Sequence, residues 1–276
     1  MARQQGRGAP AGCAPEDGSA ATPAVSVVIP ALADAAALAE NLPRVAALAG
    51  VGEIVVADAG GNEAAATVLT QVGARVVACR AGRGSQLNAG AAVATGEFLL
   101  FLHADCWLEA GAIDAAQAAL APPDIGAVVF RQRIDGERRA YRWIERAASR
   151  RAVHARCPYG DSGLFLRRRD FETIGGYPDL PLCEDLALAP RLRALGAVAE
   201  AAAVIHLSAR RWERHGIVRT TLLNFAIGWG FRFGVAPAKL YRAYYGRAPG
   251  EGAPAAARVA RGGARETEQP KGGSRA

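Results

Sequence analysis

The sequence predicts an α/β fold with a mostly parallel sheet whose two faces are covered by helices. Short β-rich segments alternate with Ala- and Leu-rich segments of helical character, which is the order that βαβ units require. The expected strands of the first half are VSVVIP (25–30), EIVVAD (53–58), ARVVAC (74–79) and EFLLFLH (97–103). They are apolar almost throughout, as strands are when helices cover both faces of a sheet. Right-handed crossovers would place them side by side.

The second half of the chain continues this pattern less regularly. Strands are predicted at 125–130 and 202–207, and a strand that runs into a helix is predicted at 162–169. Helices are expected at 136–153, which is rich in arginine, and at 183–196, which a glycine closes. No internal repeat is present, so these elements are expected to belong to one domain over residues 24–208.

Residues 209–246 are predicted to form a C-terminal amphipathic helical segment. Its central part, IVRTTLLNFAIGWGFRFGVA (217–236), is the most hydrophobic long stretch of the chain. Arg219 and Arg232 interrupt it, and its Trp and Phe content is typical of a membrane interface rather than of a membrane-spanning core. Such a helix could lie on an anionic membrane, or it could be buried against the domain, and the sequence leaves both possibilities open.

The two ends of the chain differ from the middle in composition. Residues 1–23 and 247–276 are rich in Gly, Ala, Pro and charged residues and hold almost no large apolar side chains, so we expect disordered tails there. The first of them lacks the apolar stretch of a signal peptide. We therefore expect the folded part to remain on the cytoplasmic side, at the inner face of the cell membrane.

Composition and charge narrow the range of partners. With 276 residues and 51% hydrophobic content, the chain can bury a sizeable core. The net charge is +7, only two lysines are present, and arginines concentrate in 131–169 and 210–242. Guanidinium groups suit a phosphorylated substrate, an anionic membrane or nucleic acid, although a solvated basic face is also consistent. The five cysteines are scattered without a C-x-x-C pair, which argues against a disulfide framework and a zinc cluster.

Polar side chains follow the first four expected strands at the point where each strand ends. Asp34 follows the first, Asp58 ends the second, Arg83 follows the third, and His103 with Asp105 ends the fourth. In an open parallel sheet, ligands bind beyond the carboxyl ends of the strands. Each residue alone could be an ordinary loop residue or a helix cap. Together, on one rim, they indicate a site.

Five motifs occur in a fixed order along the chain. They are SVVIPALAD, EIVVADAGGNE, AGRGSQLNAGAAVATGEFLLFLHAD, YGDSGLFLRRRDFETIGGYPDLPLCEDLALAPRLRALG and LSARRW. In this order they resemble the family 2 glycosyltransferases of the GT-A fold, and among these a short bacterial subgroup with an HAD triplet in place of D-x-D. The resemblance covers about residues 25–245. It implies a Rossmann-like sheet and a nucleoside-diphosphate sugar as donor.

The resemblance also implies roles for individual residues of the nucleotide site. Pro30 to Asp34 match the first nucleotide-binding loop, in which an acid contacts the base or ribose. Asp58 matches the acid that reads the base. Arg83 and Asn88 match the groups that approach the diphosphate or ribose, while the glycines around Arg83 could also form only a loop before a helix.

A metal site is implied at the HAD triplet. Asp105 matches the metal-binding acid of D-x-D. His103 takes the place of the first acid of that motif and is expected to contact the nucleotide. The expected cofactor is Mn²⁺ or Mg²⁺, which would bridge Asp105 and the donor diphosphate. His206, at the end of a later strand, is a candidate for an additional metal or phosphate contact, although a lone histidine is often structural.

The catalytic and acceptor residues are implied by the later motifs. Glu184 and Asp185 match the ED pair, whose second carboxylate is the base of inverting transfer, while the same acids could only favour a helix N-terminus. Asp161, in GDSG, is expected on the acceptor side. SARRW resembles the Q-x-x-R-W motif of processive relatives, so Arg211 would stabilise the diphosphate and Trp212 would form a wall of the acceptor site.

The function expected from this reasoning is a metal-dependent inverting glycosyltransferase that moves a single sugar to an acceptor hydroxyl, with a lipid as a candidate acceptor. A nucleotidyltransferase is the nearest rival, but AGRGSQLN follows the third strand and not the first. A dinucleotide-dependent oxidoreductase lacks its G-x-G-x-x-G motif. A non-catalytic phospholipid- or RNA-binding protein would not explain the ordered acids, so no nucleic-acid partner is expected. The sequence identifies neither the sugar nor the acceptor.

Overall fold

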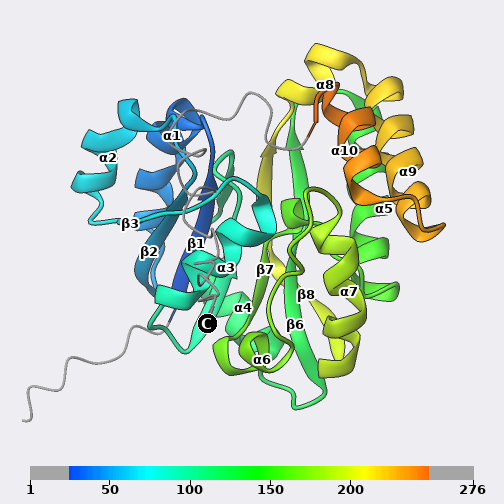
Figure 1. Ribbon diagram of the computed structural model, residues 1–276. Helices are drawn as coiled ribbons and strands as arrows, with labels where there is room; N and C mark the ends of the chain where they lie inside the picture. Colours follow the sequence, from blue (N-terminus) through cyan, green and yellow to red (C-terminus); the bar gives the residue numbers. More distant parts are fainter. Residues whose placement is uncertain (1–24, 249–276) are drawn as a thin grey trace, which may run out of the picture.

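An eight-stranded sheet with helices on both faces forms the centre of the protein (Figure 1). The computed structural model describes residues 25–248. The tails expected at 1–23 and 247–276 lie outside these residues, apart from Arg247 and Ala248. The strand order is β3-β2-β1-β4-β7-β6-β8-β5. This arrangement confirms the predicted α/β class.

The first half of the sheet is parallel, as the sequence predicted. Its strands are β1 (Val25–Ala31), β2 (Val51–Asp58), β3 (Arg75–Ala78) and β4 (Phe98–Phe101). β1 pairs in parallel with both β2 and β4, and β3 forms the edge next to β2. The connecting helices are α1 (Ala35–Ala46), η1 (Glu63–Ala65), α2 (Ala66–Gln71) and α3 (Arg83–Val93). The carboxyl ends of these strands therefore meet at one rim.

The second half of the sheet contains antiparallel pairs. Its strands are β5 (Cys106–Leu108), β6 (Ile125–Asp135), β7 (Leu164–Arg167) and β8 (Ala197–Ser208). β7 runs antiparallel to β4 and β6, and β5 runs antiparallel to β8. β6 and β8 extend well beyond the predicted 125–130 and 202–207, because they pair with each other from Ile125–Ala197 to Asp135–Ser208. β5 was not predicted.

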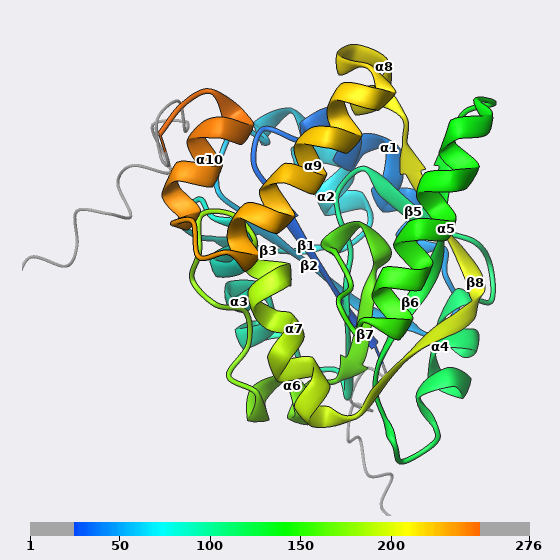
Figure 2. The same ribbon diagram turned by 90° about the vertical axis from the view of Figure 1, so that its right-hand side faces the viewer.

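The helices of the second half pack around these strands. They are α4 (Ala112–Leu120), α5 (Arg139–His154), η2 (Gly160–Ser162), α6 (Arg168–Thr173), α7 (Glu184–Leu195), α8 (Arg210–His215), α9 (Ile217–Arg232) and α10 (Pro237–Tyr245). The predicted helices at 136–153 and 183–196 correspond to α5 and α7. Figure 2 shows α9 and α10 running along the same side of the molecule as α7.

The hydrophobic core lies on both faces of the sheet. Successive residues of β1 point to opposite sides, so Val27 and Ile29 pack with α1 and α4 while Val28 packs with α3. Leu87 of α3 and Leu188 of α7 belong to the second of these clusters. This two-sided burial favours strands that are apolar at almost every position, which explains the lack of alternation in the sequence.

The C-terminal helical segment is present, but α9 does not have one apolar and one polar face. Its inner side packs on the domain through a small cluster of Ile227 with Cys183 and Leu240. Its outer side also carries large apolar residues, among them Phe225 and Phe233. No helix within residues 25–248 has the length and apolar character needed to cross a membrane.

Candidate active site

The loops at the ends of β1 and β2 form one hydrogen-bonded unit. The Asp58 carboxylate accepts hydrogen bonds from the Gly60 N–H at 2.7 Å and the Asn62 side-chain amide at 2.6 Å. Asn62 in turn accepts the Asp34 N–H at 2.6 Å, and Asp34 accepts the Leu32 N–H at 3.0 Å. Each acid uses one oxygen in this network, which fixes both carboxylates before a ligand arrives. Sequence reasoning missed the buried Asn62, although it follows the Gly-Gly turn.

Two amide side chains of α3 have structural partners. Gln86 donates to the carbonyls of Ala31 and Ala57 at 2.9 and 3.1 Å and so joins the ends of β1 and β2. Asn88 donates to the Tyr177 carbonyl at 2.8 Å and accepts the Tyr177 N–H at 2.9 Å. Asn88 would have to give up these bonds to contact a nucleotide, so its evident task is to hold the loop before α7 against α3.

Pro30 lies within β1 and is buried, in register with Ala57. It therefore shapes the floor of the predicted nucleotide loop without offering a polar group to it. Gly84, one of the two glycines that flank Arg83, approaches another part of the chain: a Cβ there would come within 2.6 Å of the Pro178 carbonyl oxygen. The glycine lets the start of α3 pack tightly on the loop that precedes α7.

Arg83, at the start of α3, lies between the loops that follow β1 and β2 and the predicted base, Asp185. Its guanidinium lies 3.6 Å from the carboxylate of Glu184, which is almost completely buried. Its charge also acts on Asp34, His103 and Asp185. The structure therefore brings together, around one arginine, residues that lie far apart in the sequence.

His103, Asp105 and Cys106 place their potential ligand atoms within 4.8 Å of one another. The Asp105 carboxylate is exposed, whereas His103 Nε2 is buried and has no hydrogen-bond partner among the described residues. Burial and the charge of Arg83 lower the pKa of His103 well below its usual value, so the ring is neutral and its lone pair is available. An unpartnered imidazole nitrogen beside a carboxylate fits a divalent cation.

Cys106 does not extend this ligand set. Burial, followed by the charge of Asp105, raises the pKa of its thiol well above the usual value, so the sulfur keeps its proton. A hard ion such as Mn²⁺ or Mg²⁺ prefers oxygen and nitrogen ligands to a thiol. The chemistry of Asp105 and His103 thus fits a metal of this kind.

His206 stands outside this group. Its ring stacks on Trp107 with centroids 3.8 Å apart, because the two residues face each other across the β5–β8 pair. Its Nδ1 lies 2.9 Å from the Asp135 carboxylate and its Nε2 lies 3.0 Å from that of Glu109. A metal contact by His206 would require one of these bonds to break.

Asp185 has the surroundings of a general base. One of its carboxylate oxygens accepts the Gly160 N–H at 2.9 Å. Burial, followed by the nearby charge of Glu184, raises its pKa from 3.8 to about 7, while Arg83 partly opposes this rise. A base with a pKa near neutrality is half ionised under physiological conditions and binds a proton strongly enough to accept it from a hydroxyl.

Asp161 lies next to Gly160 in η2. Burial raises the pKa of its carboxyl, although the charge of Arg151 and a hydrogen bond from Gln132 oppose the rise. Its Oδ1 is buried and has no hydrogen-bond partner among residues 25–248. An unpartnered buried acceptor beside the base fits the predicted acceptor side, where a substrate hydroxyl could donate to it.

Arg211 and Trp212 lie on α8. The Arg211 guanidinium lies 4.1 Å from the ring centroid of Tyr244 of α10, a cation–π contact. The Trp212 ring meets the buried Tyr141 edge to face, with centroids 6.1 Å apart, and is only partly exposed. Trp212 thus packs on the core beside Tyr141, and its place in a wall of the acceptor site stays a prediction.

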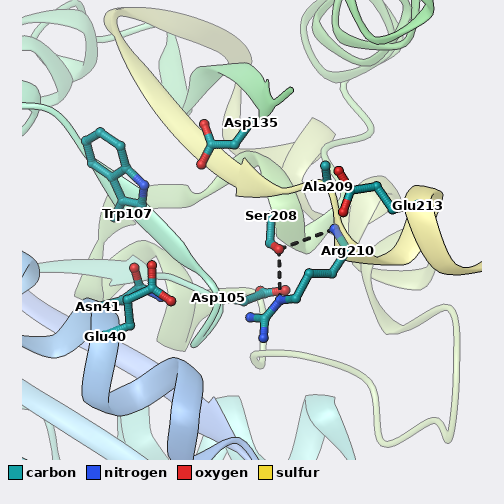
Figure 3. Close-up of a pocket in the computed structure, with 9 residues that line it drawn as sticks. All are labelled: Glu40, Asn41, Asp105, Trp107, Asp135, Ser208, Ala209, Arg210 and Glu213. Atoms are coloured by element: carbon teal, nitrogen blue, oxygen red, sulfur yellow. Dashed lines mark hydrogen bonds between the residues drawn. The ribbon is translucent and has the colours of Figure 1, made fainter. Parts of the chain in front are cut away.

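A cavity of about 310 Å³ adjoins the Asp105 carboxylate (Figure 3). It is lined by Glu40, Asn41, Asp105, Trp107, Asp135, Ser208, Ala209, Arg210 and Glu213. Arg210 donates from its backbone and side chain to the Ser208 hydroxyl, as Figure 3 shows. Asn41 donates to the Ala104 carbonyl at 3.0 Å and so supports the turn that carries His103 and Asp105. Of these residues, Asp105 alone was assigned a role from the sequence, although Ser208, Ala209 and Arg210 belong to the SARRW motif.

Comparison with solved structures finds proteins of the same fold. The mannosyltransferase PcManGT of Pyrobaculum calidifontis, solved with GDP-Man and Mn²⁺, superimposes with a TM-score of 0.58 at 19% identity, over 82% of this chain and 70% of that one. TarS 1-349 of S. aureus with UDP-GlcNAc gives a TM-score of 0.53 at 14% identity, over 67% of this chain and 58% of that one. These likenesses establish the GT-A fold. A search of curated proteins gave no match.

The sequence itself matches a protein family. The family model described as Glycosyl transferase family 2 matches residues 26–177, a segment that runs from β1 to the loop before α7. This segment carries the Asp34–Asp58 network, Arg83 and the HAD triplet. Because the match covers more than half of the chain, the protein is a glycosyltransferase that belongs to glycosyl transferase family 2.

Proposed function

We propose that this glycosyltransferase is metal-dependent and inverting, and that it transfers a single sugar from a nucleoside-diphosphate sugar to an acceptor hydroxyl. The observation that carries the proposal is the pairing, around Arg83, of a buried carboxylate whose pKa is about 7 with a carboxylate–imidazole pair that fits a divalent cation. The complexes of PcManGT with GDP-Man and Mn²⁺ and of TarS with UDP-GlcNAc support the same donor class.

The donor would be held at the rim formed by β1, β2 and β4. Asp34 and Asp58 would meet the base and ribose from loops that are already fixed by Asn62. Arg83 would attract the diphosphate, and Arg211 is a further candidate for this contact once it leaves Tyr244. Asp105 and His103 would hold Mn²⁺ or Mg²⁺, which supplies charge neutralisation to the departing diphosphate.

Asp185 would act on the acceptor. Its ionised carboxylate takes the proton of the acceptor hydroxyl while the hydroxyl oxygen bonds to the anomeric carbon. The bond between that carbon and the diphosphate oxygen breaks on the opposite side, so the configuration inverts. The Gly160 N–H orients one oxygen of the base, and Asp161 can accept a hydrogen bond from the acceptor. A lipid acceptor at a membrane surface is part of the proposal.

Calorimetry tests the donor and the metal together. The full chain is titrated with GDP- and UDP-sugars, with and without Mn²⁺, as wild type, Asp105→Ala and the exposed control Asp114→Ala. We expect Mn²⁺-dependent binding of one donor, its loss in Asp105→Ala and its retention in Asp114→Ala. Unchanged binding in Asp105→Ala would refute the metal assignment. Analysis of the product separates the rival: a transferase releases nucleoside diphosphate, whereas a nucleotidyltransferase releases pyrophosphate.

A further inference from the structure

The outer side of α9 carries a continuous row of exposed apolar side chains. They are Val218, Leu222, Phe225, Trp229 and Phe233, between 44% and 77% exposed, and we call them the α9 stripe. Their spacing of three or four residues places them on one side of the helix. The rings of Phe225, Trp229 and Phe233 contact each other in sequence, with centroids 5.8 and 5.5 Å apart. A contiguous apolar surface of this kind marks an interaction site.

Burial within the domain does not explain these residues, because the other side of α9 makes the intramolecular contacts. Leu223, Ile227 and Phe231 pack there with Cys183 and Leu240. α9 is therefore apolar on two opposite sides, of which only one is satisfied by the described part of the protein itself. A helix of a water-exposed surface normally keeps its outer side polar.

The charge around the α9 stripe is strongly positive. Residues 209–248 hold seven arginines and one lysine but a single acid, Glu213. Several of these basic residues are exposed on α8, α9 and α10, namely Arg214, Arg219, Arg232, Lys239 and Arg242. A partner for this surface must therefore accept aromatic side chains and carry negative charge.

Two other occupants fit less well. The parts of the chain outside residues 25–248 contain Met1 and Val259 as their only large apolar residues, too few to cover the stripe. A second copy of the chain would bring two strongly basic surfaces together, and like charges across an interface are unfavourable. An anionic lipid surface offers both headgroup phosphates for the basic residues and an acyl boundary for Phe and Trp.

We propose that the α9 stripe docks the protein on an anionic lipid surface. Docking would also affect the reaction, and this part of the inference rests on the proposed function. The inner side of α9 packs against Leu182, Cys183 and Leu186, the residues that flank the base Asp185. The base thus lies about one helix diameter, about 10 Å, from the docked surface. A lipid-anchored acceptor can present its hydroxyl there without leaving the membrane.

Vesicle flotation with the full chain tests the docking directly. Phosphatidylcholine vesicles with and without phosphatidylglycerol are compared at low and high salt. We expect binding only to the vesicles with phosphatidylglycerol, weakened by salt. Phe225→Glu should reduce this binding about tenfold or more. Val76→Glu places the same charge at an exposed apolar position on the edge strand β3 and should leave binding unchanged.

A double variant, Arg219→Ala with Arg232→Ala, separates charge from apolar insertion and should weaken binding about fivefold for each arginine. Binding of Phe225→Glu equal to wild type, equal binding to vesicles of phosphatidylcholine alone, or no binding at all would overturn the proposal. So would a wild-type dimer in sedimentation that Phe225→Glu dissociates. Donor calorimetry on the same variants should be unchanged, so failure of docking and failure of the proposed function are distinguishable.

Discussion

Replacing Asp185 by Asn should stabilise the protein in a pH-dependent manner while it abolishes transfer. In the folded chain the pKa of this carboxyl is about 7, whereas in the unfolded chain it returns to about 3.8. As pH rises above about 4, the unfolded chain ionises freely while the folded chain still holds the proton, so the free energy of unfolding falls. Above about pH 7 both states are ionised and the loss is complete.

The size of the effect follows from the same two values. Each unit between the folded and unfolded pKa corresponds to about 1.4 kcal/mol, so the rise of Asp185 from 3.8 to about 7 costs the wild type at most about 4 kcal/mol at alkaline pH. The amide of the Asp185→Asn variant carries no charge, and its oxygen could still accept the Gly160 N–H. The stability difference between variant and wild type should therefore grow from about zero near pH 4 to its maximum near pH 7.

Urea unfolding without metal, followed by tryptophan fluorescence at a series of pH values, measures this difference. Asp179→Asn is the matched control, since hydrogen bonds from Arg80 and Ser85 lower the pKa of Asp179 and the sign of its pH dependence is reversed. Transfer by the wild type should rise through about pH 7, and Asp185→Asn should lower it about 100- to 10,000-fold. A stability difference that is constant across pH would show that Asp185 is an ordinary surface acid and refute its assignment as base.

Three further changes test other parts of the site. His103→Asp restores a second acid beside Asp105, so Mn²⁺ affinity in the absence of nucleotide should rise about tenfold in calorimetry; an unchanged affinity would remove His103 from the ligand set. Gly160→Ala would place a Cβ against His103 Nε2 and 3.4 Å from the Asp185 carboxylate. We therefore expect kcat to fall while thermal stability drops only slightly. Full activity of this variant would contradict the tight packing of the loop. Asn88→Ala leaves the Tyr177 N–H and carbonyl unpaired and should destabilise the fold by about 1–3 kcal/mol in urea unfolding, whereas loss of donor affinity alone would restore Asn88 to the nucleotide site.

The strands that were predicted correctly are those whose own residues form a recognisable apolar run. β1, β4 and residues 54–57 of β2 are buried almost throughout and read as apolar runs, with Ser26 as the one polar residue among them. The second half of β6, RQRID, alternates between exposed arginines and the buried Gln132 and Ile134, and its strand state depends on pairing with β8. β5 has three residues, and β8 begins with alanines that read as helical. Pairing partners so distant in sequence leave no local signal, which is why the second half of the sheet was predicted incompletely.

The residues of the candidate site likewise fall into those that the sequence indicated and those that it did not. Asp34, Asp58, Asp105 and Asp185 could be named as candidates from the sequence because each stands at the end of a strand or the start of a helix within a motif. The partners that fix their surroundings could not, since they come from remote segments. Asn88 meets Tyr177 across 89 positions. The motif reveals which groups are candidates for the chemistry, and only the folded chain reveals which polar groups hold them in place.

The position of Arg83 among several carboxylates affects how a charged donor can enter the proposed site. The guanidinium of Arg83 interacts with three carboxylates, those of Asp34, Glu184 and Asp185. A free diphosphate, itself an anion, would be attracted by Arg83 and repelled by these carboxylates. A divalent cation held by Asp105 and His103 would offset this negative charge and so favour the approach of the diphosphate. We therefore expect the enzyme to bind its donor as a metal complex in preference to the free nucleotide, so that its selectivity begins before any sugar is recognised.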